Sequence, residues 1–219
     1  PTELSQYLLS LSNASGLILC AGPTGAGKTT TISSLLKEFL TLEGGFAYTI
    51  EDPTEMPLDG VYHSVAGGLG LCKQTLPPNG LWGDGLKSAL RSKPRFIMVG
   101  EIRTPDTASE VLRAATSGHL VLSTIHANNI TDAINSVVKY ASSTTMSEEL
   151  AYDLFSRGML GVLHQTLGGV KNKKPMVSYL FTNPDSTKGD QVRGIIKGGK
   201  LNLATSIETQ MTRMKRGKN

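Results

Sequence analysis

The stretch GPTGAGKT at residues 22–29 carries the strongest signal for the fold of this chain. It matches the pattern G-x-x-x-x-G-K-[ST], whose glycines let successive backbone N–H groups curl around phosphate oxygens. An apolar run, GLILCAG (16–22), precedes it, and KTTTISSLLKEFL (28–40) predicts a helix after it. By chance, from composition alone, such a glycine-rich turn would occur in on the order of one per cent of chains of this size. The stretch therefore predicts a phosphate-binding loop between a strand and a helix.

The loop supplies the residues that we expect to bind nucleotide. The Lys28 side chain is expected to reach the β- and γ-phosphates, and the Thr29 hydroxyl to ligate Mg²⁺. The amino end of the following helix adds positive potential. The predicted nucleotide-binding residues are Gly22, Pro23, Thr24, Gly25, Ala26, Gly27, Lys28, Thr29 and Thr30.

Short apolar runs alternate with helical stretches along the rest of the chain, which predicts an α/β fold with a mostly parallel sheet flanked by helices. An irregular segment rich in glycine and proline is predicted at 62–83. An apolar stretch at 158–167 has no clear assignment, and a polar turn or hairpin at 183–190 precedes a closing amphipathic segment and a basic tail. Further strands are expected at 46–50, 95–100, 119–125 and 176–181, and further helices at 3–12, 84–92, 106–118, 131–141 and 147–157.

Composition excludes several classes of protein. With 219 residues and 39% hydrophobic residues, the chain has enough material for one substantial core. The net charge of +4 is mild, aromatic residues make up only 5%, and no basic stripe interleaved with aromatics is present, so nucleic-acid binding is not favoured. Cys20 and Cys72 are expected to be buried small hydrophobic residues in a reducing cytoplasm. Apolar runs are strand-length, so no direct membrane insertion is predicted.

The run FIMVGEIR (96–103) supplies a second half of a nucleotide site. Four apolar residues lead to Gly100 and Glu101, the pattern of a Walker B strand. Because carboxyl ends of parallel strands line the ligand crevice, Glu101 could order the water shell of Mg²⁺. The alternative is that Glu101 is only a charged residue at the end of a strand. The presence of the predicted phosphate-binding loop in the same chain makes this alternative minor.

Three acids end the apolar run FAYTIEDPTEMPL (46–58): Glu51, Asp52 and Glu55, around Pro53. Two interpretations are open: the acids activate a water molecule beside a bound phosphate, or they only form a solvated turn. A residue before proline is held extended, so Asp52 is expected to continue the strand. Glu51 and Glu55 would then share one side about 13 Å apart, with Asp52 opposite. In that arrangement the three carboxylates could not all reach the same water molecule.

Histidines and arginines are ranked by position. His119 and His126 bracket a strand and would lie about 20 Å apart. His126, at the carboxyl end, is expected to sense the γ-phosphate, and His119 to serve packing or a subunit contact. Phosphoryl transfer also needs a cation, often an arginine from a neighbouring subunit. Arg103 and Arg91 are the arginines selected for that role among those flanking the Walker B strand.

TIEDPTE, GEIR and SGHLVLSTIHA, in this order after GPTGAGKTTT, resemble the bacterial secretion and type IV pilus ATPase superfamily, over roughly residues 4–210. The resemblance implies a RecA-like motor that hydrolyses ATP with Mg²⁺, assembles as a homo-hexamer and works with secretion or pilus components at the cytoplasmic face of the inner membrane. It implies Glu55 as general base, with Thr29, Asp52 and Glu101 at the metal and Glu51 near it.

Departures from the family pattern refine this expectation. The tetracysteine module of many type II secretion ATPases is missing, which favours the pilus-retraction, conjugation and type IVB secretion branches, with no metal beyond Mg²⁺. Asn135 and Ser136 stand where pilus ATPases often carry an acid–arginine pair. Only residues 1–21 precede the loop, so we expect a motor domain without the family's N-terminal domain. Residues 1–170 would form the ATPase core with its leader helix, and 171–219 a C-terminal extension of the same domain.

Three functions follow from these motifs. The first is an ATP-hydrolysing motor for secretion, conjugation or pilus dynamics. The second is a nucleotide-binding scaffold subunit with negligible turnover, which would have no need to keep Lys28, Glu55 and Glu101 together. The third, a RecA-like helicase or recombinase, loses ground because no nucleic-acid surface is visible in the sequence.

Overall fold

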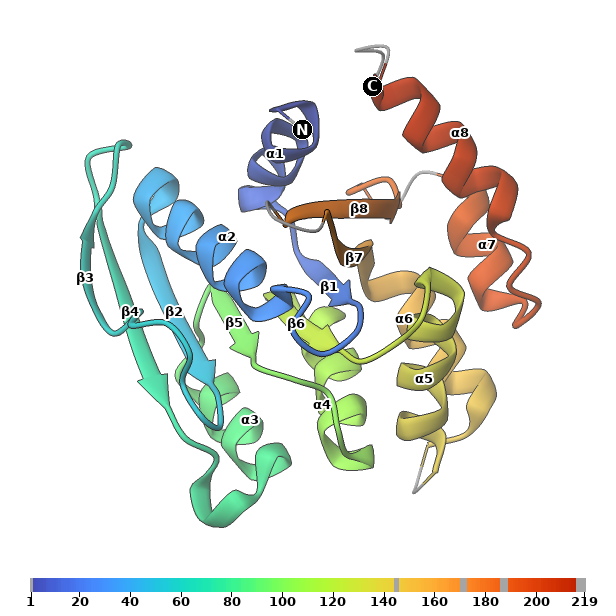
Figure 1. Cartoon of the computed structure of the whole chain (residues 1–219). Coiled ribbons are helices and arrows are strands. Elements are labelled where there is room, and N and C mark those ends of the chain that lie inside the picture. The colour runs from blue at the N-terminus through green and yellow to red at the C-terminus, as the bar shows by residue number, and fades with distance from the viewer. Residues whose placement is uncertain (1, 144–145, 170–172, 186–188, 216–219) are drawn as a thin grey trace.

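The computed structural model describes residues 2–143, 146–169, 173–185 and 189–215. One sheet forms its centre, and its eight strands are β1 (Gly16–Ala21), β2 (Gly45–Ile50), β3 (Gly60–His63), β4 (Leu69–Thr75), β5 (Phe96–Val99), β6 (Leu120–Ile125), β7 (Met159–Gly168) and β8 (Lys174–Phe181). Their order across the sheet is β3-β4-β2-β5-β6-β1-β7-β8 (Figure 1). The pairs β2–β4, β2–β5, β5–β6, β1–β6 and β1–β7 are parallel, and the outermost pairs β3–β4 and β7–β8 are antiparallel. The predicted mostly parallel sheet is confirmed.

Helices cover both faces of the sheet (Figure 1). They are α1 (Thr2–Ser10), α2 (Lys28–Glu43), α3 (Trp82–Arg91), α4 (Pro105–Ala115), α5 (Ile130–Ser142), α6 (Glu148–Gly158), α7 (Gln191–Lys197) and α8 (Ala204–Lys215), with 3₁₀ turns at Leu11–Asn13 and Pro78–Gly80. Helices α1 and α2 pack on one face, and α3 to α7 pack on the other. Helix α8 lies against the edge strand β8.

Alternation along the central strands divides the core into two layers. In β1, Leu17 and Leu19 face the layer under α4 and α5, whereas Ile18 and Cys20 face the layer under α2. All six residues of β1 are buried, as expected for a parallel strand covered on both sides. Cys20 and Cys72 are free and buried, and burial raises the pKa of each thiol to about 12, so both are unreactive at neutral pH.

The strands and helices expected from periodicity are present with ends shifted by a few residues. The prediction of an irregular segment at 62–83 is wrong in part, because this region holds β4, the end of β3 and the start of α3. The unassigned stretch at 158–167 forms most of β7, and the closing segment forms two helices, α7 and α8. Parts of the polar turn (186–188) and of the basic tail (216–219) lie outside the described residues.

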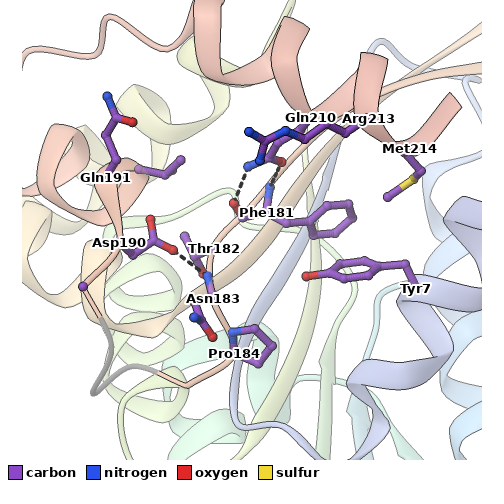
Figure 2. Close-up of a pocket in the computed structure, with 12 residues that line it drawn as sticks. Tyr7, Phe181, Thr182, Asn183, Pro184, Asp190, Gln191, Gln210, Arg213 and Met214 are labelled. Carbon is purple, nitrogen blue, oxygen red and sulfur yellow. Dashed lines mark hydrogen bonds between the residues drawn. The ribbon is translucent and has the colours of Figure 1, made fainter. Parts of the chain in front are cut away.

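The C-terminal helices are fastened to the sheet by polar side chains. Gln210 of α8 accepts from the backbone N–H of Phe181 and donates to its carbonyl, both at 2.8 Å, as Figure 2 shows. Asp190 accepts from the N–H of Asn183 at 2.5 Å. A hollow of about 530 Å³ lies between α1, β8, α7 and α8. Its lining contains none of the residues predicted to bind nucleotide.

Arg193 of α7 closes the carboxyl end of α6. Its guanidinium donates to the carbonyl oxygens of Ser156 and Arg157 at 2.5 and 2.6 Å, and to that of Asn183 at 2.9 Å. Carbonyls in the last turn of a helix have no partner within the helix, so these bonds satisfy groups that would otherwise be left unpaired. None of the described helices is long and apolar enough to cross a bilayer.

Replacing Arg193 should therefore destabilise the fold. We expect Arg193→Ala to lower the free energy of unfolding by about 2–4 kcal/mol in urea denaturation, because three carbonyls, that of Ser156 part-buried, lose a charged donor. The control is Arg157→Ala, whose exposed side chain forms an i,i+4 ion pair with Asp153 at 2.7 Å and no other ion pair within the described ranges. That variant should lose less than about 1 kcal/mol. Equal small losses in both variants would contradict the capping role.

Candidate active site

The predicted phosphate-binding loop (residues 22–29) lies between the carboxyl end of β1 and the start of α2, where the motif predicted it. Gly22 and Gly25 have φ of +151° and +76°, values that L side chains rarely adopt. A Cβ on Gly22 would lie 2.1 Å from the carbonyl oxygen of Gln165, so any side chain there would displace the neighbouring strand. Beside Gly25, nothing described lies within 4 Å of that position. The loop thus packs closely against β7 at Gly22 and has open space at its tip, Gly25.

The motif's polar residues lie at the amino end of α2. This helix begins at Lys28, and its cap residue Gly27 provides no side-chain hydrogen bond, which leaves the first turn available to an anion. The Lys28 ammonium donates to the carbonyl of Pro23 at 3.0 Å and so folds back over the loop. Thr29 is half-buried, and Thr30 is exposed.

A cavity of about 60 Å³ lies beside Thr29 at the carboxyl ends of β2 and β5. This is room for a few water molecules. All three acids of the EDPTE segment and the Walker B acid contribute to its wall. Its lining residues are Thr29, Glu51, Asp52, Pro53, Glu55, Trp82, Gly100, Glu101 and Arg103. The fold therefore brings together the residues predicted for metal binding and water activation.

The expected arrangement of the three acids is wrong. Strand β2 ends at Ile50, and the chain bends at Asp52 and Pro53 instead of continuing extended. Alternation along a strand no longer applies to this segment, so Asp52 does not lie opposite Glu51 and Glu55. All three line the same cavity.

Burial separates Glu51 from the other two acids. Glu51 is only 1% exposed, whereas Asp52 and Glu55 are exposed. One Glu51 carboxylate oxygen accepts from the Gln74 amide at 2.8 Å, and the other oxygen, Oε2, is buried with no hydrogen-bond partner among the described residues. A buried carboxylate oxygen without a partner costs free energy unless a cation or water binds it.

Gln74 of β4 was missed by sequence reasoning. Besides Glu51, its amide donates to the carbonyl of Met56 at 2.8 Å and accepts from the N–H of Leu58 at 3.1 Å. It thereby holds both ends of the acidic segment. No motif could have identified it, because its position depends on the parallel pairing of β4 with β2, inside a region predicted to be irregular.

Glu101 is engaged by Arg103 of the same chain. The Arg103 Nε and Nη2 atoms lie 2.6 and 2.5 Å from Glu101 Oε2. The Arg103 side chain is 64% exposed, so solvent screens this pair and either residue can change partner. A contact from Arg103 to a neighbouring subunit stays a prediction. Arg91, at the end of α3, is exposed and forms no ion pair with another described residue.

The two histidines lie at opposite ends of β6, as expected. His126 follows the carboxyl end, is exposed and does not line the cavity. His119 precedes the amino end, and its Nδ1 lies 2.7 Å from the carbonyl oxygen of Pro94. His119 therefore has a structural contact, and the phosphate-sensing role of His126 stays a prediction.

The donor set suits Mg²⁺. The Thr29 hydroxyl and the carboxylates of Asp52 and Glu101 offer oxygen ligands, which hard cations prefer. Glu51, whose Oε2 has no partner among the described residues, lines the same cavity. Over the described ranges, no group of three or more His, Cys, Asp or Glu side chains could hold a metal by itself. A Mg²⁺ ion here would take its remaining ligands from phosphate and water, which is how Mg²⁺ is held in nucleotide sites.

Comparison with known proteins gives a consistent result. The family model described as "Type II/IV secretion system protein" matches residues 1–177. The type IV pilus assembly ATPase TfpB of Acinetobacter baylyi is 39% identical over 170 residues, which is 75% of this chain and 25% of that protein. The type II secretion system protein E of Xanthomonas campestris is 35% identical over 157 residues, or 69% of this chain and 26% of that protein. The chain thus spans about a quarter of the length of these curated relatives.

Solved structures agree on the fold. The pilus retraction motor PilT with bound ADP has a TM-score of 0.74 at 28% identity, over 98% of this chain and 57% of that one. The Legionella pneumophila ATPase DotB, at 20% identity, has a TM-score of 0.72 over 99% of this chain and 60% of that one, a likeness of fold alone. The fold is thus the predicted RecA-like one, and the chain belongs to the type II/IV secretion system protein family, within the superfamily of secretion and type IV pilus ATPases.

Proposed function

We propose that this chain is the ATP-hydrolysing motor part of a secretion, conjugation or type IV pilus ATPase. The observation that carries the proposal is the convergence of Thr29, the EDPTE acids and Glu101 on one small cavity beside the phosphate-binding loop. A scaffold that only bound nucleotide would need the loop but not this cluster. By analogy with the relatives, the motor would act as a homo-hexamer at the cytoplasmic face of the inner membrane, with pilus or secretion components as partners.

Each part of the site has a role in the proposed reaction. The backbone N–H groups of residues 24–29 bind the phosphates of ATP, and the Lys28 ammonium offsets their charge. Thr29, Asp52 and Glu101 would hold Mg²⁺, which would supply positive charge against the phosphates of ATP. A carboxylate of the EDPTE segment orients the attacking water and accepts its proton.

Two acids compete for the role of general base. The resemblance implied Glu55, but its side chain is exposed, whereas Glu51 is held by Gln74, lines the same cavity and has a second carboxylate oxygen without a partner among the described residues. A base that is fixed in place needs less reorganisation when the water reacts. These contacts favour Glu51 as the base and leave Glu55 as an acid at the cavity mouth.

The transition state also needs a cation. Arg103 is the one arginine among the described residues that line the cavity, and it is paired with Glu101. We propose that Arg103, Arg91 or a cation of a neighbouring subunit completes the site on assembly, with His126 contacting the γ-phosphate.

A nucleotide-binding scaffold is the second candidate. The Arg103–Glu101 pair favours it, because Glu101 must exchange Arg103 for the water shell of Mg²⁺ before it can serve hydrolysis. A chain in which this exchange was unfavourable would bind ATP and turn it over negligibly.

Lys28→Ala should abolish detectable ATP hydrolysis, because the phosphates lose their only point charge from the loop. Phosphate release measures turnover. Circular dichroism should show an unchanged fold, because the hydrogen bond of the Lys28 ammonium to the Pro23 carbonyl is exposed and lies within the loop itself. Hydrolysis at the parental rate would contradict the assignment of the loop.

Glutamine variants of the three glutamates should differ in turnover and in the Mg²⁺ concentration that they need. Glu51→Gln retains the hydrogen bond with Gln74 but removes the base, so turnover should fall at least about a hundredfold with ATP binding nearly intact. Glu55→Gln should cost less than about tenfold, within the range of one hydrogen bond. Glu101→Gln should raise the Mg²⁺ concentration needed for half-maximal turnover. A hundredfold loss in Glu55→Gln, with Glu51→Gln near the parental rate, would assign the base to Glu55.

Turnover and mass should be measured together over a series of protein concentrations. If a neighbour completes the site, turnover per subunit should rise as oligomers form. A flat and negligible rate across a measured monomer-to-oligomer transition would favour the scaffold. A flat but substantial rate would mean that one chain holds the whole site.

A further inference from the structure

Gln165 is a polar residue in the core that the proposed reaction does not use. It lies on β7, the strand next to β1, and its side chain is 4% exposed. A primary amide carries two donors and an acceptor, and burying it costs free energy unless these are paired. Its partners therefore indicate what the residue does.

Both partners of this amide belong to the phosphate-binding element. Gln165 Nε2 donates to the carbonyl oxygen of Ala26 at 2.6 Å, in the loop itself. Gln165 Oε1 accepts from the Thr31 hydroxyl at 2.8 Å, in the first turn of α2. The amide thus joins the end of the loop to the start of the helix through a third element, 139 and 134 residues away along the chain.

The backbone at Gln165 also limits the loop. Its carbonyl oxygen would lie 2.1 Å from a Cβ on Gly22, and its Nε2 would lie 3.2 Å from a Cβ on Gly27. The loop therefore contacts this one residue at its start through the backbone and near its end through the side chain. A loop rich in glycine loses much conformational freedom on ordering, so a fixed contact that selects one conformation reduces what phosphate binding must supply.

We propose that Gln165 is the positioning residue of the phosphate-binding loop: it ties the Ala26 carbonyl back into the core so that the loop's N–H groups stay directed at the phosphates. This inference rests on the proposed nucleotide-binding function and assigns a residue to it. An amide is needed because one atom must donate to a carbonyl while the other accepts from a hydroxyl. Methionine has a similar size, but its thioether cannot donate and accepts only weakly.

The test compares Gln165→Met with Gln210→Met. Gln210 is a matched control, because its amide also makes two bonds, both to Phe181 backbone groups at 2.8 Å, and it lies in α8, outside the candidate site. Affinity is measured by titration with a fluorescent ribose-labelled ADP in the presence of Mg²⁺, with competition by inorganic pyrophosphate, and thermal unfolding reports stability. The pyrophosphate arm isolates the phosphates from the base and ribose.

Gln165→Met should bind ADP and pyrophosphate about tenfold more weakly, by the same factor for both, since the loss of two hydrogen bonds acts on the phosphate cradle. Gln210→Met should bind as the parent does even where its unfolding temperature falls. If Gln165→Met does not fold, Thr31→Val removes one end of the link, and it should weaken both ligands about threefold. A role in stability alone would lower the unfolding temperature without changing either affinity of the folded protein.

The outcomes distinguish the two proposals. If the parent binds ADP and either loop variant, Gln165→Met or Thr31→Val, binds it within the error of the parent, the positioning role is rejected and nucleotide binding stands. If the parent and Lys28→Ala both fail to bind ADP, the proposed function is rejected, and the role of Gln165 with it.

Discussion

The parallel, in-register pairing of β2 with β5 is the constraint on which the candidate site depends. Ile50 lies opposite Val99, and the N–H of Gly100 donates to the Ile50 carbonyl at 2.9 Å. The next residues of the two strands are therefore held side by side, and Glu51 and Glu101 open into one cavity although 50 positions separate them in the sequence. Antiparallel pairing would send one acid to the far edge of the sheet. Because β6 and β1 continue the same parallel order, the phosphate-binding loop emerges at this edge as well.

Sequence reasoning succeeded where the information is local. The loop, the strand before it and the helix after it follow from one contiguous motif, and the buried strands follow from apolar runs that two covering layers require. It failed at β3, whose residues alternate between half-buried and exposed, and at β4, most of whose residues alternate between exposed and buried; both contain glycines that weaken the strand signal. It also failed at Asp52, where the rule for residues before proline was applied beyond the end of the strand. The chain bends there, so the preference of a residue before proline for extended backbone did not prolong the strand.

The residues that sequence reasoning missed are those whose partners are distant. Gln74 reaches Glu51 over 23 positions, and Gln165 reaches Ala26 over 139. A glutamine in a strand pattern carries no local sign of being buried, and only the completed sheet places its amide next to an orphaned backbone or carboxylate group. The candidate site is thus predictable in its charged parts, which motifs encode, and not in the neutral groups that hold those parts in position.

The two glutamines occupy equivalent places in the sheet. Within the order β4-β2-β5-β6-β1-β7, Gln74 lies on the outer neighbour of β2 and Gln165 on the outer neighbour of β1. Each amide crosses to the loop that leaves the adjacent strand, so the acidic segment and the phosphate-binding loop are each held from the strand flanking them. A loop at the edge of a sheet has few neighbours of its own and would otherwise sample many conformations. Because β4 also pairs with β3, and β7 with β8, each glutamine links one of the two outer antiparallel pairs to a loop of the candidate site.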